Sequence, residues 1–171
     1  MDTISHALWG KGFFGYRGKP YWSLFFGALP DLFSFGLYTI ITLLLNPEGM
    51  QYGKPEFTND HYIHTLYGCT HSLFIATICV VIVYMFLNKN FAFAMLAWPL
   101  HILIDIPTHT IDYFPTPILF PLGEIWTILD IKFNGVSWGK PYVFIPNVAG
   151  LIILYIYRFY IRKDNKKNNA I

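Results

Sequence analysis

The pair His101 and Asp105 is the strongest chemical signal in this sequence. The two residues are four apart, so in a helix their side chains project from one face, one turn from each other. A neutral imidazole and a carboxylate at that spacing can bind one divalent metal ion. The alternative is a hydrogen bond between them that satisfies two buried polar groups, and the pair by itself does not separate the two interpretations.

Other ionisable residues that suit a metal site lie far apart along the chain. Asp31 follows Pro30 in an apolar stretch, where a carboxylate also suits the N-terminus of a helix. His71 lies in a second apolar stretch, where a lone histidine at the membrane interface is the ordinary interpretation. His6 lies in a short apolar segment at the start of the chain. Four of these residues could come together as metal ligands, with Asp31 as a ligand or as the general base: Asp31, His71, His101 and Asp105.

Three more histidines are weaker candidates. Because Pro107 lacks a backbone donor, we expect it to end or kink its helix near Ile106. His109 then falls in a loop rather than on the metal-binding face. His61 and His64 lie before the apolar core of the second stretch, in a polar approach that is more typical of the membrane interface than of a catalytic site.

Four stretches of the chain are apolar enough to cross a membrane, for which about 20 residues are needed. They are residues 21–45, 62–87, 91–111 and 141–157, and the last continues to about residue 161. Only residues 88–90 separate the second stretch from the third, which predicts a tight hairpin between antiparallel helices. Residues 4–14 are apolar but too short to span. Pro30 leaves open whether the first stretch is one kinked helix or breaks near Asp31.

The composition agrees with a membrane protein. Of the 171 residues, 54% are hydrophobic and 13% are charged, whereas soluble domains carry about 25% charged residues. We expect an all-α polytopic membrane bundle of about four transmembrane helices plus a short N-terminal helix. It forms one domain over residues 1–161, followed by a basic cytoplasmic tail at 162–171. The net charge of +2 gives no reason to expect a nucleic-acid partner.

The distribution of charge predicts an orientation. Lysine and arginine are concentrated before residue 20, in the hairpin at Lys89 and after residue 157, while acidic residues predominate in the connections 46–61 and 112–140. Cytoplasmic segments carry the excess of positive charge, so we expect both termini and the hairpin to be cytoplasmic. Four spans with both termini on one side are consistent with this.

Taken together, the motifs resemble the YdjM-like family of bacterial membrane-bound, metal-dependent hydrolases. The motifs that carry the resemblance are Asp2-Thr-Ile-Ser-His6, Gly27-Ala-Leu-Pro-Asp31-Leu, Thr70-His71-Ser72-Leu73, Leu100-His101-Ile-Leu-Ile-Asp105-Ile-Pro-Thr-His109, Phe114-Pro-Thr-Pro-Ile-Leu-Phe-Pro121 and Phe133-Asn-Gly-Val-Ser-Trp-Gly139. The resemblance covers nearly the whole chain except the basic tail. It implies a divalent-metal hydrolase of the bacterial inner membrane, with five metal ligands: His6, Asp31, His71, His101 and Asp105. Many relatives carry a second acid soon after the Pro-Asp pair, where this chain has Leu32-Phe33-Ser34, which weakens the case for a full two-metal site.

The function expected from these residues is metal-assisted hydrolysis. A divalent ion, most simply zinc, would activate water against an ester or phosphoester. The location among membrane lipids suggests a lipid-linked or amphiphilic substrate. Two alternatives use the same residues: a small transporter or ion- or proton-conducting protein, and a structural protein whose polar groups join its helices. The sequence names neither the substrate nor the oligomeric state.

Overall fold

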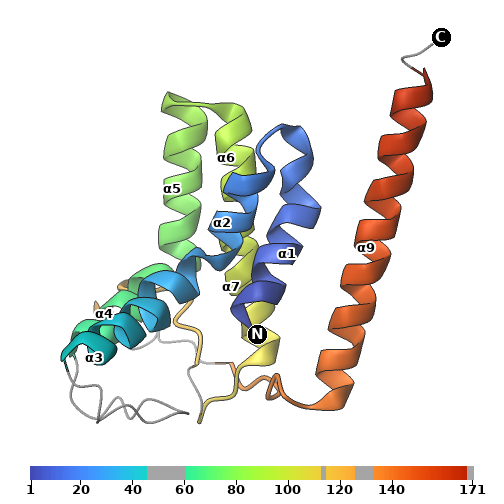
Figure 1. Ribbon diagram of the computed structural model, residues 1–171. Coiled ribbons are helices and arrows are strands. Elements are labelled where there is room, and N and C mark those ends of the chain that lie inside the picture. The colour runs from blue at the N-terminus through green and yellow to red at the C-terminus, as the bar shows by residue number, and fades with distance from the viewer. Residues whose placement is uncertain (46–60, 113–114, 126–132, 169–171) are drawn as a thin grey trace.

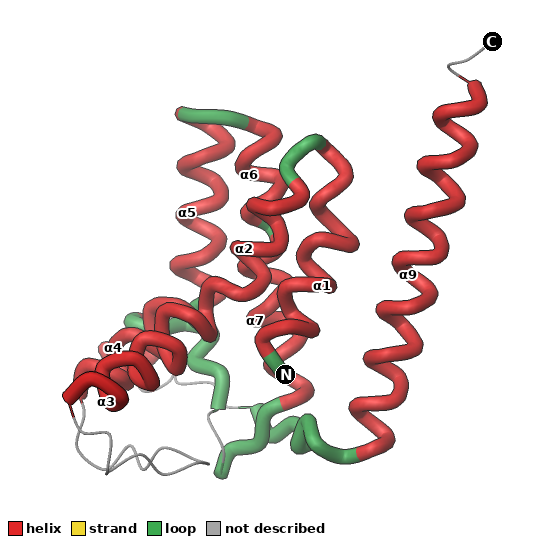
Figure 2. The backbone as a smooth tube through the Cα atoms, in the orientation of Figure 1, coloured by secondary structure: helices red, strands yellow, loops and turns green. Residues whose placement is uncertain are grey.

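The computed structural model describes residues 1–45, 61–112, 115–125 and 133–168, and the regular secondary structure of these residues is helical (Figures 1 and 2). This confirms the all-α prediction. In chain order the elements are α1 (Thr3–Phe14), η1 (Gly15–Arg17), α2 (Pro20–Asp31), η2 (Leu32–Gly36), α3 (Leu37–Leu45), α4 (His61–Thr70), α5 (Leu73–Phe86), α6 (Lys89–Met95), α7 (Ala97–Thr108), α8 (Leu122–Ile125) and α9 (Pro141–Asn168).

Three helical segments are long and apolar enough to cross a membrane: Pro20–Leu45, Lys89–Thr108 and Pro141–Ile161. A fourth candidate is the pair Tyr62–Thr70 and Leu73–Phe86, which bends by 54° at a short break. The predicted count of four therefore requires the bent pair to act as a single span. The short N-terminal helix is present as α1.

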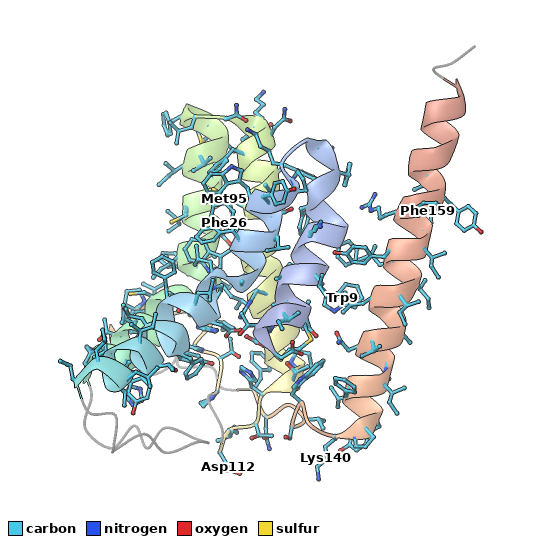
Figure 3. All side chains as sticks on the ribbon, in the orientation of Figure 1. Trp9, Phe26, Met95, Asp112, Lys140 and Phe159 are labelled. Carbon is cyan, nitrogen blue, oxygen red and sulfur yellow. The ribbon has the colours of Figure 1, made fainter. Side chains whose placement is uncertain are left out.

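The surface of these helices is rich in large apolar side chains. The side chains of Val81, Ile82 and Met85 are exposed on α5. Those of Ile153 and Phe159 are exposed on α9 (Figure 3). Contiguous apolar surface of this kind needs an apolar environment to cover it. Together with the candidate spans, it indicates a membrane protein.

Helices α1 and α2 form a hairpin whose backbones touch. A Cβ atom added to Gly27 would lie 2.6 Å from the carbonyl oxygen of His6, and one added to Gly10 would lie 2.6 Å from that of Ser23. Glycine permits this approach because it has no side chain. The contact brings the N-terminal end of α1 against the C-terminal end of α2.

The tight hairpin predicted at residues 88–90 is confirmed. Asn88 caps α6, since its side-chain oxygen accepts a hydrogen bond from the backbone N–H of Phe91 at 2.9 Å. Helices α5 and α6 then run side by side (Figure 1), and α6 leads into α7 after Leu96. An apolar core around Phe26 and Met95 lies between α2 and α6 (Figure 3).

The segment 21–45 is a continuous helical path, so the kinked-helix alternative is the correct one. Pro30 lies inside α2, and the π-helical turn η2 follows directly after Asp31. The alternative role of Asp31 as a helix cap is wrong, because Asp31 lies at the end of α2 and its side chain makes no capping bond. Single π-helical turns are frequent at functional sites.

The helix that contains Pro107, α7, ends close to Ile106, as predicted: its last residue is Thr108, and His109 follows in an extended conformation. The backbone N–H of His109 still donates to the carbonyl oxygen of Asp105 at 3.0 Å. A proline in the last turn removes only its own backbone donor, so the turn closes around it.

The two ends of the chain lie at different levels. Figure 1 shows the end of α9 beyond the level of the α5–α6 hairpin, whereas Met1 lies among the helices nearer the opposite end. Helix α9 passes through the predicted boundary at 161–162 and continues to Asn168. Residues 46–60 of the predicted acidic connection, and 169–171 of the tail, lie outside the described residues. The cytoplasmic placement of the termini stays a prediction.

Candidate metal centre

The ends of four helices meet at the part of the bundle that lies farthest from the α5–α6 hairpin (Figure 1). They are the N-terminal ends of α1 and α5, the C-terminal end of α2, and the C-terminal half of α7. All five residues singled out in the sequence lie at this junction, and all are buried: His6, Asp31, His71, His101 and Asp105.

The bend between α4 and α5 carries His71 into the junction. Ser72 caps α5, since its hydroxyl oxygen accepts from the backbone N–H of Ile75, and the same hydroxyl donates to the carbonyl oxygen of Phe120 at 2.6 Å. The indole N–H of Trp98 donates to the carbonyl oxygen of Thr70 at 2.7 Å. These bonds hold the residues on both sides of His71, so the imidazole is fixed between helices.

Four side-chain atoms face one another at the centre. The Nε2 atom of His71 lies 3.6 Å from Asp31 Oδ1 and 3.8 Å from Asp105 Oδ2. The Nε2 atom of His101 lies 3.7 Å and 2.9 Å from the same two oxygens. Tetrahedral zinc with bonds of about 2.0–2.1 Å separates neighbouring ligand atoms by about 3.3–3.4 Å. Three of the four nitrogen–oxygen distances are slightly longer than this ligand separation and one is shorter, so the cluster has room for one such ion.

Three of these atoms have no hydrogen-bond partner among the described residues: Nε2 of His71, Nε2 of His101 and Oδ2 of Asp105. A buried polar atom left unpaired costs about 1–3 kcal/mol. His101 and Asp105 are close enough to form an ion pair, with Nε2 and Oδ2 2.9 Å apart. Imidazole nitrogen and carboxylate oxygen are donors that zinc accepts, and the residues present therefore fit a divalent metal ion.

The far side of each imidazole ring is held by a backbone carbonyl. The Nδ1 atom of His101 lies 2.7 Å from the carbonyl oxygen of Gly27, and Nδ1 of His71 lies 3.3 Å from that of Tyr67. An Nδ1–H that donates to a carbonyl leaves the Nε2 lone pair free for a metal. This tautomer is assigned from the hydrogen-bond partners.

Each carboxylate uses one oxygen for support and directs the other toward the histidines. Asp31 Oδ2 accepts from the hydroxyl of Thr3 at 2.8 Å. Asp105 Oδ1 accepts from Nε2 of His6 at 2.8 Å and from the amine of Met1 at 2.7 Å. Outer contacts of this kind orient the ligands of a metal site.

His6 occupies a position beside the four facing atoms. Its ring stacks on that of His101 with centroids 3.5 Å apart. Burial lowers the pKa of His6 to about 4, so the ring is neutral at physiological pH. His6 also belongs to a second group that could hold a metal, with Asp31 and His101. The bond to Asp105 favours an orienting role, while the second group keeps a direct role open.

Sequence reasoning undervalued or missed three neighbours of the site. His109 Nε2 lies 3.5 Å from Asp105 Oδ1, just past the end of α7, and its spacing of four from Asp105 was a signal that the proline argument outweighed. The ring of Tyr67, one turn before His71, stacks on that histidine at 4.0 Å. Thr3 is remote in sequence from Asp31 and gave no signal. His64 is exposed, and the side chain of His61 lies outside the described part.

Comparison with known proteins finds no matching family model, no similar curated protein and no similar solved structure. The resemblance to the YdjM-like family therefore rests on the motifs in the sequence.

Proposed function

We propose that this chain is an integral-membrane, metal-dependent hydrolase of the YdjM-like kind, with zinc held by side chains of α2, of the break between α4 and α5, and of α7. The observation that carries the proposal is the buried group His71, His101 and Asp105, whose Nε2, Nε2 and Oδ2 atoms face one another and accept or donate no hydrogen bond within the part of the chain that the structure describes. Catalytic zinc sites commonly use three protein ligands and keep one position open. These three residues supply such a set.

Asp31 faces the open side of the proposed site. Its side chain is 11% exposed, whereas those of His71 and Asp105 are fully buried. A carboxylate at that position can complete the ligand set or accept a proton from an attacking water. Thr3 holds Oδ2 of Asp31, so Oδ1 remains directed at the reacting centre in either role.

The chemistry follows from this set of residues. Bound zinc would lower the pKa of a water molecule and polarise an ester or phosphoester oxygen. His71, His101 and Asp105 supply fixed donors, since their other polar atoms are held by carbonyls, by His6 and by Met1. His6 orients Asp105 and closes the site from α1. The apolar helices around the site favour an amphiphilic substrate drawn from the membrane.

Hydrolysis by the purified protein in detergent tests the proposal. We expect turnover of bis(p-nitrophenyl) phosphate or p-nitrophenyl acetate that chelation abolishes and added zinc restores. His101→Ala should lose both zinc and activity, while the control His64→Ala, which changes an exposed histidine, should keep both. Activity that survives complete metal removal would overturn the proposal. Stoichiometric zinc without turnover of either substrate, together with zinc flux into proteoliposomes, would replace it with the transport alternative.

A further inference from the structure

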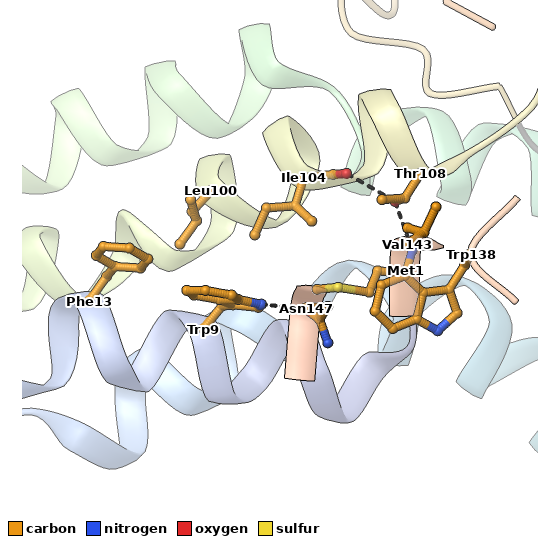
Figure 4. A pocket seen from close by; sticks show the side chains of 9 residues that line it. All are labelled: Met1, Trp9, Phe13, Leu100, Ile104, Thr108, Trp138, Val143 and Asn147. Atoms are coloured by element: carbon orange, nitrogen blue, oxygen red, sulfur yellow. Dashed lines mark hydrogen bonds between the residues drawn. The ribbon is translucent and has the colours of Figure 1, made fainter. Parts of the chain in front are cut away.

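A cavity of about 270 Å³ lies beside the metal centre, between α1, α7 and α9 (Figure 4). Trp9 and Phe13 of α1 form one wall, and Leu100 and Ile104 of α7 form another. Val143 contributes from α9. The cavity therefore lies among helices that include two of the candidate membrane spans.

The cavity and the metal centre share helix α7. The cavity-lining residues Leu100, Ile104 and Thr108 are spaced by four. Leu100 and Ile104 immediately precede His101 and Asp105 of the site, and Thr108 precedes the neighbouring His109. Successive residues of a helix are turned by about 100°. Helix α7 thus presents the apolar cavity on one face and the metal-facing side chains on the adjoining face.

Met1 and Thr108 lie where the cavity and the cluster meet. Both line the cavity. The amine of Met1 contacts the hydroxyl of Thr108 at 3.3 Å and donates to Asp105 Oδ1 at 2.7 Å. A molecule whose chain fills the cavity would therefore have its other end next to the Asp105 carboxylate.

The side-chain polar groups of Trp9, Asn147 and Thr108 in the cavity wall already form hydrogen bonds within the protein. The side-chain oxygen of Asn147 accepts from the indole N–H of Trp9 at 2.6 Å, and its amide donates to the hydroxyl of Ser5 at 3.3 Å. The hydroxyl of Thr108 donates to the carbonyl oxygen of Ile104 at 2.9 Å. A polar ligand would find few free partners along these walls, so the lining suits an apolar occupant.

The segment after residue 132 docks beside the site and borders the cavity. The backbone N–H groups of Gly135 and Val136 donate to the carbonyl oxygens of His109 and Pro107, both at 2.8 Å. A Cβ atom added to Gly135 would lie 2.5 Å from the carbonyl oxygen of Pro107, so only glycine permits this close approach. The docked segment places Trp138 on the cavity (Figure 4).

We propose that this cavity binds a single hydrocarbon chain of the substrate, with the ester or phosphoester head group at the metal centre. The assignment of the head group rests on the proposed function. From Leu100 to Thr108 the cavity follows α7 for about 12 Å, compared with about 15 Å for half of a bilayer's hydrocarbon core. Pockets for whole drug-sized ligands hold roughly 300–1,000 Å³. The observed volume therefore suits one chain rather than a complete lipid.

Chain-length selectivity is the first test. The measured quantity is the ratio of kcat/KM for octyl p-nitrophenyl phosphate to that for methyl p-nitrophenyl phosphate. Ile104→Phe, which fills the cavity, should lower this ratio by about tenfold or more. Its neighbour Leu103 is exposed on the other side of α7, and Leu103→Phe should leave the ratio unchanged. Equal ratios in the two variants would overturn the proposal.

Photo-crosslinking tests the cavity without requiring turnover. A dodecyl phosphate with a terminal diazirine is irradiated with zinc-depleted protein in detergent, and the labelled residues are mapped by mass spectrometry. We expect labels on Trp9 and Trp138 in the wild type, and their loss in Val143→Phe. The matched control is Ile145→Phe, which changes an exposed residue of α9 and should keep the labels. Labels confined to the outer surface of α9 would overturn the proposal.

The two tests separate the cavity from the chemistry. Cavity labels that disappear in Val143→Phe, in a protein that hydrolyses neither substrate, would support the binding of the chain and contradict the proposed function. Hydrolysis that depends on zinc but shows neither chain-length selectivity nor cavity labels would support the proposed function and contradict the role of the cavity.

Discussion

The two oxygens of each carboxylate, Asp31 and Asp105, have different contacts. In each, one oxygen is fixed by a hydrogen-bond donor on α1 or at its start, and the other faces the histidines. The first helix is too short to span a membrane, yet it supplies the supporting contacts for both acids. At the residue scale, the site is therefore an inner set of donors held by outer contacts from α1.

The hydroxyl of Thr3 offers a test of this outer support. Thr3→Ala removes the bond to Asp31 Oδ2 and should weaken zinc binding by about 10–100-fold, as is typical for contacts that orient metal ligands. Thr39→Ala removes a hydroxyl that bonds only within its own exposed helix and should leave the affinity unchanged. Competition with a chromogenic zinc chelator gives both affinities. Equal values would show that Thr3 does not support the site.

The sequence was sufficient to select the residues of the cluster but not their supporting contacts. Histidine and aspartate are costly in apolar stretches, so their positions at 31, 71, 101 and 105 stood out. Thr3 and Tyr67 are ordinary residue types in their surroundings, and only the folded chain brings them to the site. Whether His6 binds metal directly remains a prediction.

At the scale of elements, the hairpin of α1 and α2 decides the geometry of the site. Its backbones touch at Gly10 and Gly27, and the carbonyl of Gly27 also orients His101. The spans and the 88–90 hairpin could be predicted because hydropathy and capping are local properties. The bend beside His71 could not, since it depends on contacts with Phe120 and Trp98 from distant parts of the chain.

A substitution at Gly27 tests the importance of this contact. Gly27→Ala would place a Cβ atom 2.6 Å from the carbonyl oxygen of His6, and we expect a loss of about 1–3 kcal/mol in the free energy of unfolding. At Gly36 a Cβ atom would meet nothing closer than 3.6 Å, so Gly36→Ala should be neutral or stabilise the helix by up to about 1 kcal/mol. Unfolding in mixed detergent measures both. A Gly27→Ala variant as stable as Gly36→Ala would contradict the close contact.

At the scale of the whole molecule, the metal centre and the basic end of the bundle are far apart. The α5–α6 hairpin and the turn between α1 and α2 lie at one end (Figure 1), whereas His71 of the cluster precedes the opposite end of α5. Helix α5 has 14 residues, or about 21 Å. Because the hairpin is predicted to be cytoplasmic, the cluster is predicted to lie toward the outer half of the bilayer.

Reporter fusions test this orientation. We expect a fusion within residues 88–90 to report the cytoplasm and a fusion after residue 125 to report the opposite side, because the charge bias separates these segments. A fusion after residue 168, at the end of α9, is the internal control and should agree with the hairpin. Reports from the same side at 88–90 and 125 would contradict both the four-span arrangement and the depth of the site.

Metal analysis combined with X-ray absorption tests whether imidazole and carboxylate groups hold a zinc ion. We expect about one zinc per chain, bound only by nitrogen and oxygen at about 2.0–2.1 Å, with no sulfur at about 2.3 Å from Cys69 or Cys79. His101→Ala and Asp105→Ala should each lose the metal. Wild-type protein without near-stoichiometric metal, or variants that keep it, would contradict the account.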